Sequence, residues 1–157
     1  MITRPHPSSL LLLLLAFTLT GCSSFNSKWS SFKPQPLPPS GIGGRWEGKW
    51  ISEVSGHEGR LRCIVEKSEN AKATEAIAID YRFSFSATWG PGIVSDYDIE
   101  MKVQPAAEGG MAFEGDMDLG VFMGVYRCKG RIVGDQFTAT YTSDQDHGTF
   151  EMSRPVK

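Results

Sequence analysis

The sequence predicts an all-β domain, most simply an eight-stranded antiparallel up-and-down β-barrel. From Gly43 onward, apolar and polar residues alternate with a period of two, and turn-forming residues recur about every ten positions. A sheet with one apolar face and no helices to cover it buries that face by curling on itself, which also removes its edge strands. A two-sheet β-sandwich is the alternative.

Eight segments carry this alternation. We expect strands at residues 45–53, 59–67, 77–89, 93–104, 110–118, 122–132, 135–142 and 148–154. Turn residues such as Gly90-Pro91-Gly92 and Gly134-Asp135 separate them. Because most connections are short, consecutive strands should be antiparallel neighbours. The longest connection, Ser68 to Glu75, has room for one helical turn.

The inward face of these strands is rich in aromatic residues. The predicted interior includes Trp46, Trp50, Tyr81, Phe83, Phe85, Trp89, Tyr97, Phe113, Tyr126, Phe137, Tyr141 and Phe150. Aromatic rings at a barrel mouth can hold a small apolar ligand. For that role we single out Trp50, Tyr81, Phe83, Phe85, Trp89, Tyr97, Tyr126 and Tyr141. The same residues are also compatible with a filled core, since an eight-stranded barrel is just wide enough either to be filled by side chains or to hold one small ligand.

The first 21 residues have the features of an export signal. Arg4 is their only Lys or Arg, and it precedes an apolar run from Leu10 to Leu19. A helix of that length covers about half of the hydrocarbon core of a bilayer, so it is too short for a permanent span. The run is therefore interpreted as the apolar region of a signal peptide, residues 1–21.

The leader ends in Leu19-Thr20-Gly21-Cys22, which resembles the lipobox of bacterial lipoproteins. The resemblance implies cleavage before Cys22 and attachment of a diacylglyceryl group to its thiol, with further acylation, such as by palmitate, at the new amine. Two or more acyl chains anchor a protein stably without a spanning helix. Ser23 in place of aspartate favours, by the same resemblance, the outer membrane of the bacterial cell envelope, with the domain in the periplasm as one option.

Residues 22–42 are predicted to be a flexible tether between the lipidated cysteine and the domain at 43–157. The segment is rich in serine and ends in several prolines, which favours a flexible start and a stiffer, extended end.

Gly44-Arg45-Trp46 opens the first predicted strand, Gly48-Lys49-Trp50 repeats the pattern, and Arg154 ends the last strand. This combination resembles the calycin barrels, which include lipocalins, fatty-acid-binding proteins and avidins. In that group the tryptophan closes one end of the barrel and a basic residue packs over it. The resemblance implies that Trp46 and Arg154 are in contact at a closed end.

Two cysteines lie within the domain. Cys63 and Cys128 both fall on the inward register of their strands. An oxidising envelope compartment would permit a disulfide, but strands two and six lie across an eight-stranded barrel from each other. A disulfide and two buried free thiols are equally compatible with the sequence.

Several classes of function have no support in the sequence. After cleavage the chain has 15 basic and 18 acidic residues, and no basic stripe to recruit nucleic acid. Acidic residues of the fourth and fifth strands form an outer patch, interpreted as a solvated face, and the two histidines that follow the leader lack the spacing of a zinc site. No cofactor or metal is expected. No catalytic motif is present, so an enzyme is not expected.

The sequence therefore predicts a non-enzymatic envelope lipoprotein, held to the membrane by its N-terminal lipid. The first hypothesis is that the barrel binds a small apolar ligand. The alternative is a protein-interaction or inhibitor module with a filled barrel, which resembles in its organisation the lipoprotein lysozyme inhibitors.

Overall fold

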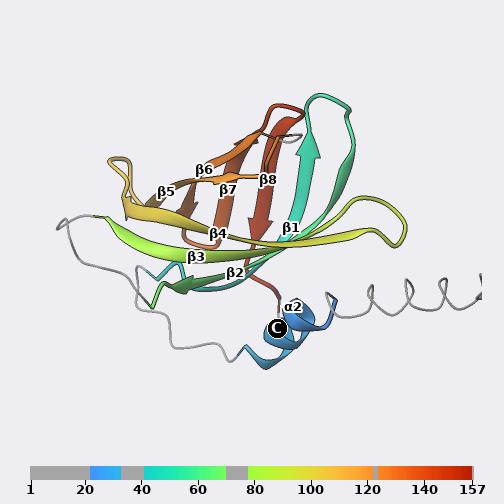
Figure 1. Cartoon of the computed structure of the whole chain (residues 1–157). Coiled ribbons are helices and arrows are strands. Elements are labelled where there is room, and N and C mark those ends of the chain that lie inside the picture. The colour runs from blue at the N-terminus through green and yellow to red at the C-terminus, as the bar shows by residue number, and fades with distance from the viewer. Residues whose placement is uncertain (1–21, 33–40, 70–77, 122–123, 157) are drawn as a thin grey trace, which may run out of the picture.

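The chain folds into one closed antiparallel barrel with a short helix against its outer wall (Figure 1). The computed structural model describes residues 22–32, 41–69, 78–121 and 124–156. The elements are α2 (Cys22–Ser31), β1 (Gly44–Ser52), β2 (Glu58–Lys67), β3 (Ile79–Thr88), β4 (Val94–Pro105), β5 (Met111–Asp118), β6 (Val125–Val133), β7 (Gln136–Thr142) and β8 (His147–Ser153). The predicted fold class is confirmed.

Closure is made by the pairing of the first and last strands. Trp50 lies opposite Phe150 and Gly48 opposite Met152, so β1 pairs with β8 as well as with β2. Every strand thus has two hydrogen-bonded neighbours, and the sheet has no edge that invites aggregation. The two-sheet alternative is excluded.

Apolar and polar residues, which alternate along the sequence, face the barrel interior and the solvent respectively. Strand β7 alternates between exposed and buried residues along its whole length, as expected for a wall with one dry face. The fully buried inward side chains are Trp46, Leu61, Cys63, Val65, Phe83, Phe85, Met101, Val103, Cys128 and Phe137. This core fixes the register, because a slip of one residue would turn each of these side chains to solvent.

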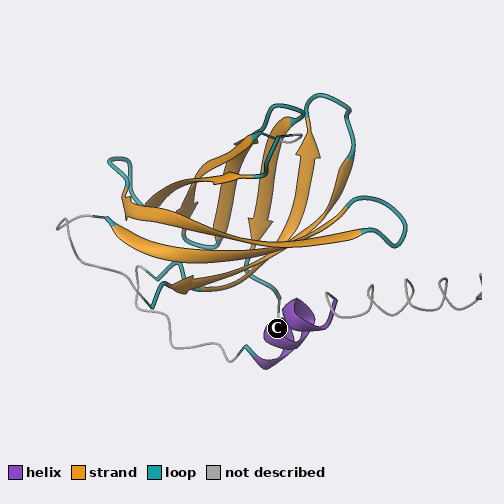
Figure 2. Ribbon diagram, in the orientation of Figure 1, coloured by secondary structure: helices purple, strands orange, loops and turns teal. Residues whose placement is uncertain are grey.

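The barrel is bent where β4 meets β5. The long strands β3 and β4 cross the front of the molecule, whereas β7 and β8 run steeply behind them (Figure 2). Pairing between β4 and β5 is confined to Lys102–Pro105 against Met111–Glu114. Just beyond, a Cβ on Gly115 would lie 2.6 Å from the carbonyl oxygen of Glu100. Glycine at this position lets the backbone of β4 pass directly over β5.

Helix α2 differs from the flexible tether that the sequence predicts. Phe25 is buried and its ring stacks on that of Trp29. The Arg62 guanidinium lies 5.0 Å from the centre of the Phe25 ring, and Lys28 forms an ion pair of 2.6 Å with Glu66. Ten residues rich in serine would not hold a helix alone, so this docking must supply the stability. The remainder of the predicted tether, 33–40, lies outside the described residues, as does the signal peptide.

The helix covers part of the outer face of β2 and β3. Ile64, Ser84 and Ser86 alternate with inward residues, yet each is 3% exposed or less. The ammonium of Lys28 donates a hydrogen bond to the Ser84 hydroxyl at 3.2 Å, which places α2 over this patch. An apolar residue in the outward register, Ile64, therefore marks where a second element packs.

The predicted contact between Trp46 and Arg154 is confirmed. The Arg154 guanidinium carbon lies 3.8 Å from the centre of the indole. The same guanidinium donates hydrogen bonds to the carbonyl oxygens of Gly43 at 2.7 Å and Gly41 at 3.1 Å. The Trp46 indole N–H donates to the carbonyl of Ile42 at 3.0 Å. The segment before β1 is thus held across this end of the barrel, and the packed domain includes Ile42, one residue earlier than predicted.

Candidate functional site

The barrel interior is occupied by aromatic rings in contact with one another. The ring of Phe83 lies 5.1 Å from that of Phe113 and 6.3 Å from that of Phe137, and Phe85 lies 5.6 Å from Phe150. These are ordinary centre-to-centre separations for packed aromatic side chains. The centre of the barrel is therefore filled by its own side chains.

The eight residues predicted to line a ligand site are divided between this core and its rim. Five of them, Trp50, Phe83, Phe85, Tyr126 and Tyr141, are buried, and two, Tyr81 and Tyr97, are partly buried. The prediction that Trp89 points inward is wrong, because its side chain is 48% exposed. Strand β3 ends at Thr88, so Trp89 already belongs to the turn and its ring packs at 4.3 Å against Trp50 from the rim.

The tyrosine hydroxyls near this rim are bound to protein groups. The hydroxyls of Tyr97 and Tyr126 lie 3.2 Å apart, and that of Tyr141 donates to Asp146 at 2.8 Å. The Ser52 hydroxyl donates to the other carboxylate oxygen of Asp146 at 2.7 Å. Burial raises the pKa of Tyr97, Tyr126 and Tyr141 above the ordinary value, so all three phenols are neutral in the folded protein.

Of the two alternatives for the domain cysteines, the structure has two buried free thiols. Cys63 lies opposite Trp46 on β1 and Phe85 on β3, within the aromatic core. Burial raises the pKa of Cys63 well above its ordinary value and that of Cys128 to about 12. Both groups are therefore protonated thiols, and poor nucleophiles, at neutral pH.

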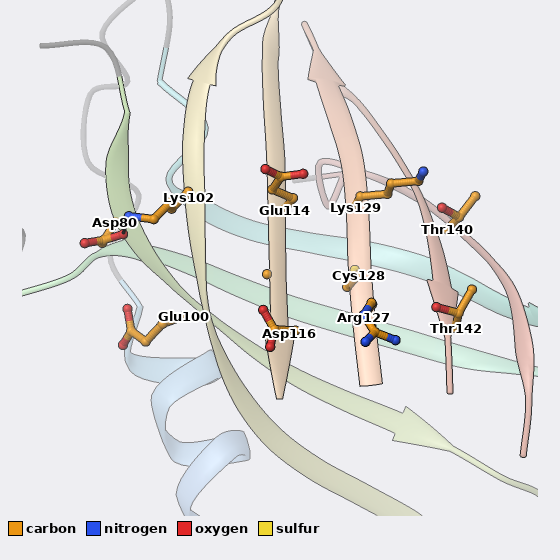
Figure 3. A pocket seen from close by; sticks show the side chains of 11 residues that line it. Asp80, Glu100, Lys102, Glu114, Asp116, Arg127, Cys128, Lys129, Thr140 and Thr142 are labelled. Atoms are coloured by element: carbon orange, nitrogen blue, oxygen red, sulfur yellow. Dashed lines mark hydrogen bonds and ion pairs between the residues drawn. The ribbon is translucent and has the colours of Figure 1, made fainter. Parts of the chain in front are cut away.

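A hollow lies on the outer wall rather than inside the barrel (Figure 3). This hollow, which we call the outer groove, has a volume of about 460 Å³ and spans strands β3 to β7. It is lined by Asp80, Glu100, Lys102, Glu114, Gly115, Asp116, Arg127, Cys128, Lys129, Thr140 and Thr142. The bend at Gly115, where β4 leaves its pairing with β5, makes this part of the wall concave.

Opposite charges face each other across the floor of the outer groove. Glu114 of β5 is paired in register with Lys129 of β6, and Asp116 is paired with Arg127. Within the described residues none of these four side chains forms an ion pair at 4.0 Å or less. Their charges therefore remain available to a bound partner.

On the β3 and β4 side of the outer groove, unlike on its floor, charged side chains form ion pairs with each other. Lys102 pairs with Asp80 at 3.4 Å, and Arg82 donates to Glu100 at 2.9 Å. The bond to Glu100 raises the pKa of the Arg82 guanidinium. These ion pairs link β3 to β4. The groups that remain to contact a partner are the charged side chains of β5 and β6 and the two threonines of β7.

The outer groove was not predicted from the sequence. Alternation correctly places Glu114 and Asp116 on the outer face, but the predicted patch was acidic throughout. The register between β5 and β6 puts a cation opposite each of these acids. Among the described residues, no three metal-ligating side chains are grouped to hold a metal ion.

Neither protein-family models, curated proteins nor solved structures give a match to this chain.

Proposed function

We propose that this protein is a non-enzymatic lipoprotein of the bacterial cell envelope whose barrel binds an envelope protein through the outer groove. Two independent features support the proposal. The N-terminal sequence supports the anchor, and the contrast between a filled interior and a charged outer groove supports the mode of binding.

The anchor is proposed on the lipobox-like sequence that ends at Cys22. No helix in the described part of the chain is long and apolar enough to cross a bilayer. Substitution Cys22→Ser removes the thiol that would carry the diacylglyceryl group. We expect the variant to leave the membrane fraction and to lose palmitate label, whereas retention of both would contradict the anchor.

The binding mode is proposed on one observation. Glu114, Asp116, Arg127 and Lys129 lie in a hollow on the outer wall, and none of them forms an ion pair with another residue that the structure describes. Their two rows of opposite charge, with the hydroxyls of Thr140 and Thr142 beside the cations, match a polypeptide segment that carries both charges. Complementary charge of this kind confers specificity and faster association on an interface.

A photocrosslinking side chain at Thr142 tests this binding mode in intact cells. Thr142 lines the groove, whereas Thr138 lies on the exposed face of the same strand and does not line it. We expect a discrete crosslinked protein from position 142 and none from position 138. Adding Arg127→Ala and Lys129→Ala should abolish the product, and the control Arg60→Ala on β2 should not.

Equal crosslinking from positions 138 and 142, insensitive to the two groove cations, would contradict the proposal. The experiment therefore shows whether the partner is recognised through the groove cations, and it does not require that the partner be identified first.

The first hypothesis from the sequence, a small apolar ligand, becomes the second candidate. It is supported by Tyr97, which is only partly buried at the rim, and by the exposed ring of Trp89. A ligand inside the barrel would have to displace packed rings. Titration with an apolar fluorescent dye tests this candidate, because saturable binding lost in Tyr126→Trp would place the dye in the interior.

A further inference from the structure

We infer that the turn between β3 and β4, residues 89–93, together with Val94, rests in the surface of the same lipid bilayer that holds Cys22. The inference rests on the proposed lipid anchor and adds an orientation: one particular turn of the barrel faces the membrane.

Helix α2 limits how far the barrel can lie from the bilayer. Helix α2 begins at Cys22 itself. Phe25 is buried three residues later, and Lys28 is fixed by Glu66 one turn further on. A helix rises about 1.5 Å per residue, so the acylated residue lies within about 5 Å, along the helix, of a residue packed on the barrel. A helix docked in this way leaves no long tether, and the barrel wall must lie near the lipid surface.

The start of α2 lies beside the beginning of strand β4. Ser24 and Phe25 share a hollow of about 380 Å³ with Asp96, Tyr97 and Asp98. These residues are near the beginning of β4, a few positions after the β3–β4 turn. In Figure 1 this turn projects from the barrel on the side at which α2 begins. The contacts of α2 with Glu66 and Arg45 are made by later residues of the helix, Lys28 and Trp29.

The β3–β4 turn exposes apolar side chains and carries no charge. Trp89, Ile93 and Val94 are 48%, 60% and 45% exposed. These are three of the nine large apolar side chains exposed among the described residues. From Ala87 to Ser95 the chain has no charged residue. A tryptophan beside aliphatic residues on an uncharged tip is suited to the membrane interface, where aromatic rings are enriched.

Fluorescence quenching by brominated lipids tests the orientation. The full lipidated chain is reconstituted in vesicles of phosphatidylethanolamine and phosphatidylglycerol, with or without bromine atoms high on the acyl chains. Trp89 is one of four tryptophans. We expect brominated lipid to remove about a quarter of the emission, and the variant Trp89→Phe to lose most of this quenching.

A matched control moves the reporter to the opposite end of the barrel. Val133, the last residue of β6, is 48% exposed, the same as Trp89. The double variant Trp89→Phe with Val133→Trp should show no more quenching than Trp89→Phe alone. The wild-type chain in the same vesicles is the folded reference for both variants.

Two outcomes overturn the inference, and they are distinguishable. A chain that floats with the vesicles but shows equal quenching at positions 89 and 133 overturns the orientation and leaves the anchor intact. A chain extracted from its own membranes without lipid on Cys22, which does not float, overturns the proposed anchor and the orientation together.

Discussion

Truncation of Arg154 tests how the barrel is closed. The substitution Arg154→Ala removes two charge-assisted hydrogen bonds, to Gly43 at 2.7 Å and to Gly41 at 3.1 Å. It also removes a cation–π contact of 3.8 Å with Trp46. Burial already lowers the pKa of this guanidinium, so part of its desolvation cost is recovered when it is removed.

The expected loss follows from these contacts. A hydrogen bond to a charged group contributes about 1.5 to 3 kcal/mol and a cation–π contact about 0.5 to 2 kcal/mol. The lower limits for two such hydrogen bonds and one cation–π contact add to about 3.5 kcal/mol. The net loss is smaller, because Arg154 is partly exposed and water can replace it at the carbonyl groups. We expect the free energy of unfolding to fall by about 2 to 3 kcal/mol, which is about 1 M in the urea midpoint for an m value of about 2 kcal/mol/M.

Urea melts of the chain from Ser23 to Lys157 measure this effect. Arg60→Ala is the matched control, because Arg60 is exposed and its ion pair with Glu47 spans 3.6 Å. Its expected cost is below about 0.5 kcal/mol. Arg154→Lys retains the charge without the planar fork and should lie between the two. Equal midpoints for the wild type and Arg154→Ala would refute the role of Arg154 in closure.

Two further predictions concern stability. Raising the pH above about 9 should destabilise the fold, because the unfolded chain then loses protons from Cys128 and the tyrosines that the folded barrel retains, by up to about 1.4 kcal/mol per pH unit for each group. Denaturant melts from pH 8 to 11 measure this loss, which should be smaller in Tyr126→Phe, and a flat profile would contradict it. Phe25→Ala should weaken the docking of α2 by about 1 to 2 kcal/mol, since it removes a buried ring. Hydrogen exchange of the α2 amides should then accelerate while that of β7 does not, and Ser30→Ala should leave both unchanged.

The fold was predictable because burial in a barrel depends on local alternation. Strand β7, predicted at 135–142, is observed at Gln136–Thr142, and its period of two is visible without any tertiary information. The contact of Trp46 with Arg154 was predictable for the same reason, since closure makes the first and last strands neighbours. The period of two thus identified the inward residues within the strands, whereas it failed for Trp89, which lies just after the end of β3.

Helix α2 was not predicted because its signal is short and depends on tertiary contacts. Phe25, Trp29 and Phe32 have the spacing i, i+4 and i+7, which places them on one helical face. The surrounding serines and asparagine favour caps and turns over helix interiors. Contacts with the barrel wall, such as those of Arg45 and Arg62 over the Trp29 ring, make the helix favourable.

The outer groove was not predicted because it depends on register and curvature. The alternation pattern gives the outward face of β5 but not which residue of β6 lies opposite Glu114. The concavity arises at Gly115, where the missing side chain brings two strands together. Neither property is encoded in the hydropathy of a single strand.

The intact mass of the protein extracted from its own membranes tests the proposed lipid anchor. We expect a chain that begins at Cys22 and exceeds the mass of residues 22–157 by a diacylglyceryl group, with or without a further acyl chain. Fragmentation should place this added mass on Cys22. A chain that retains residues 1–21, or one that begins at another residue without lipid, would show that Cys22 is not a lipid anchor.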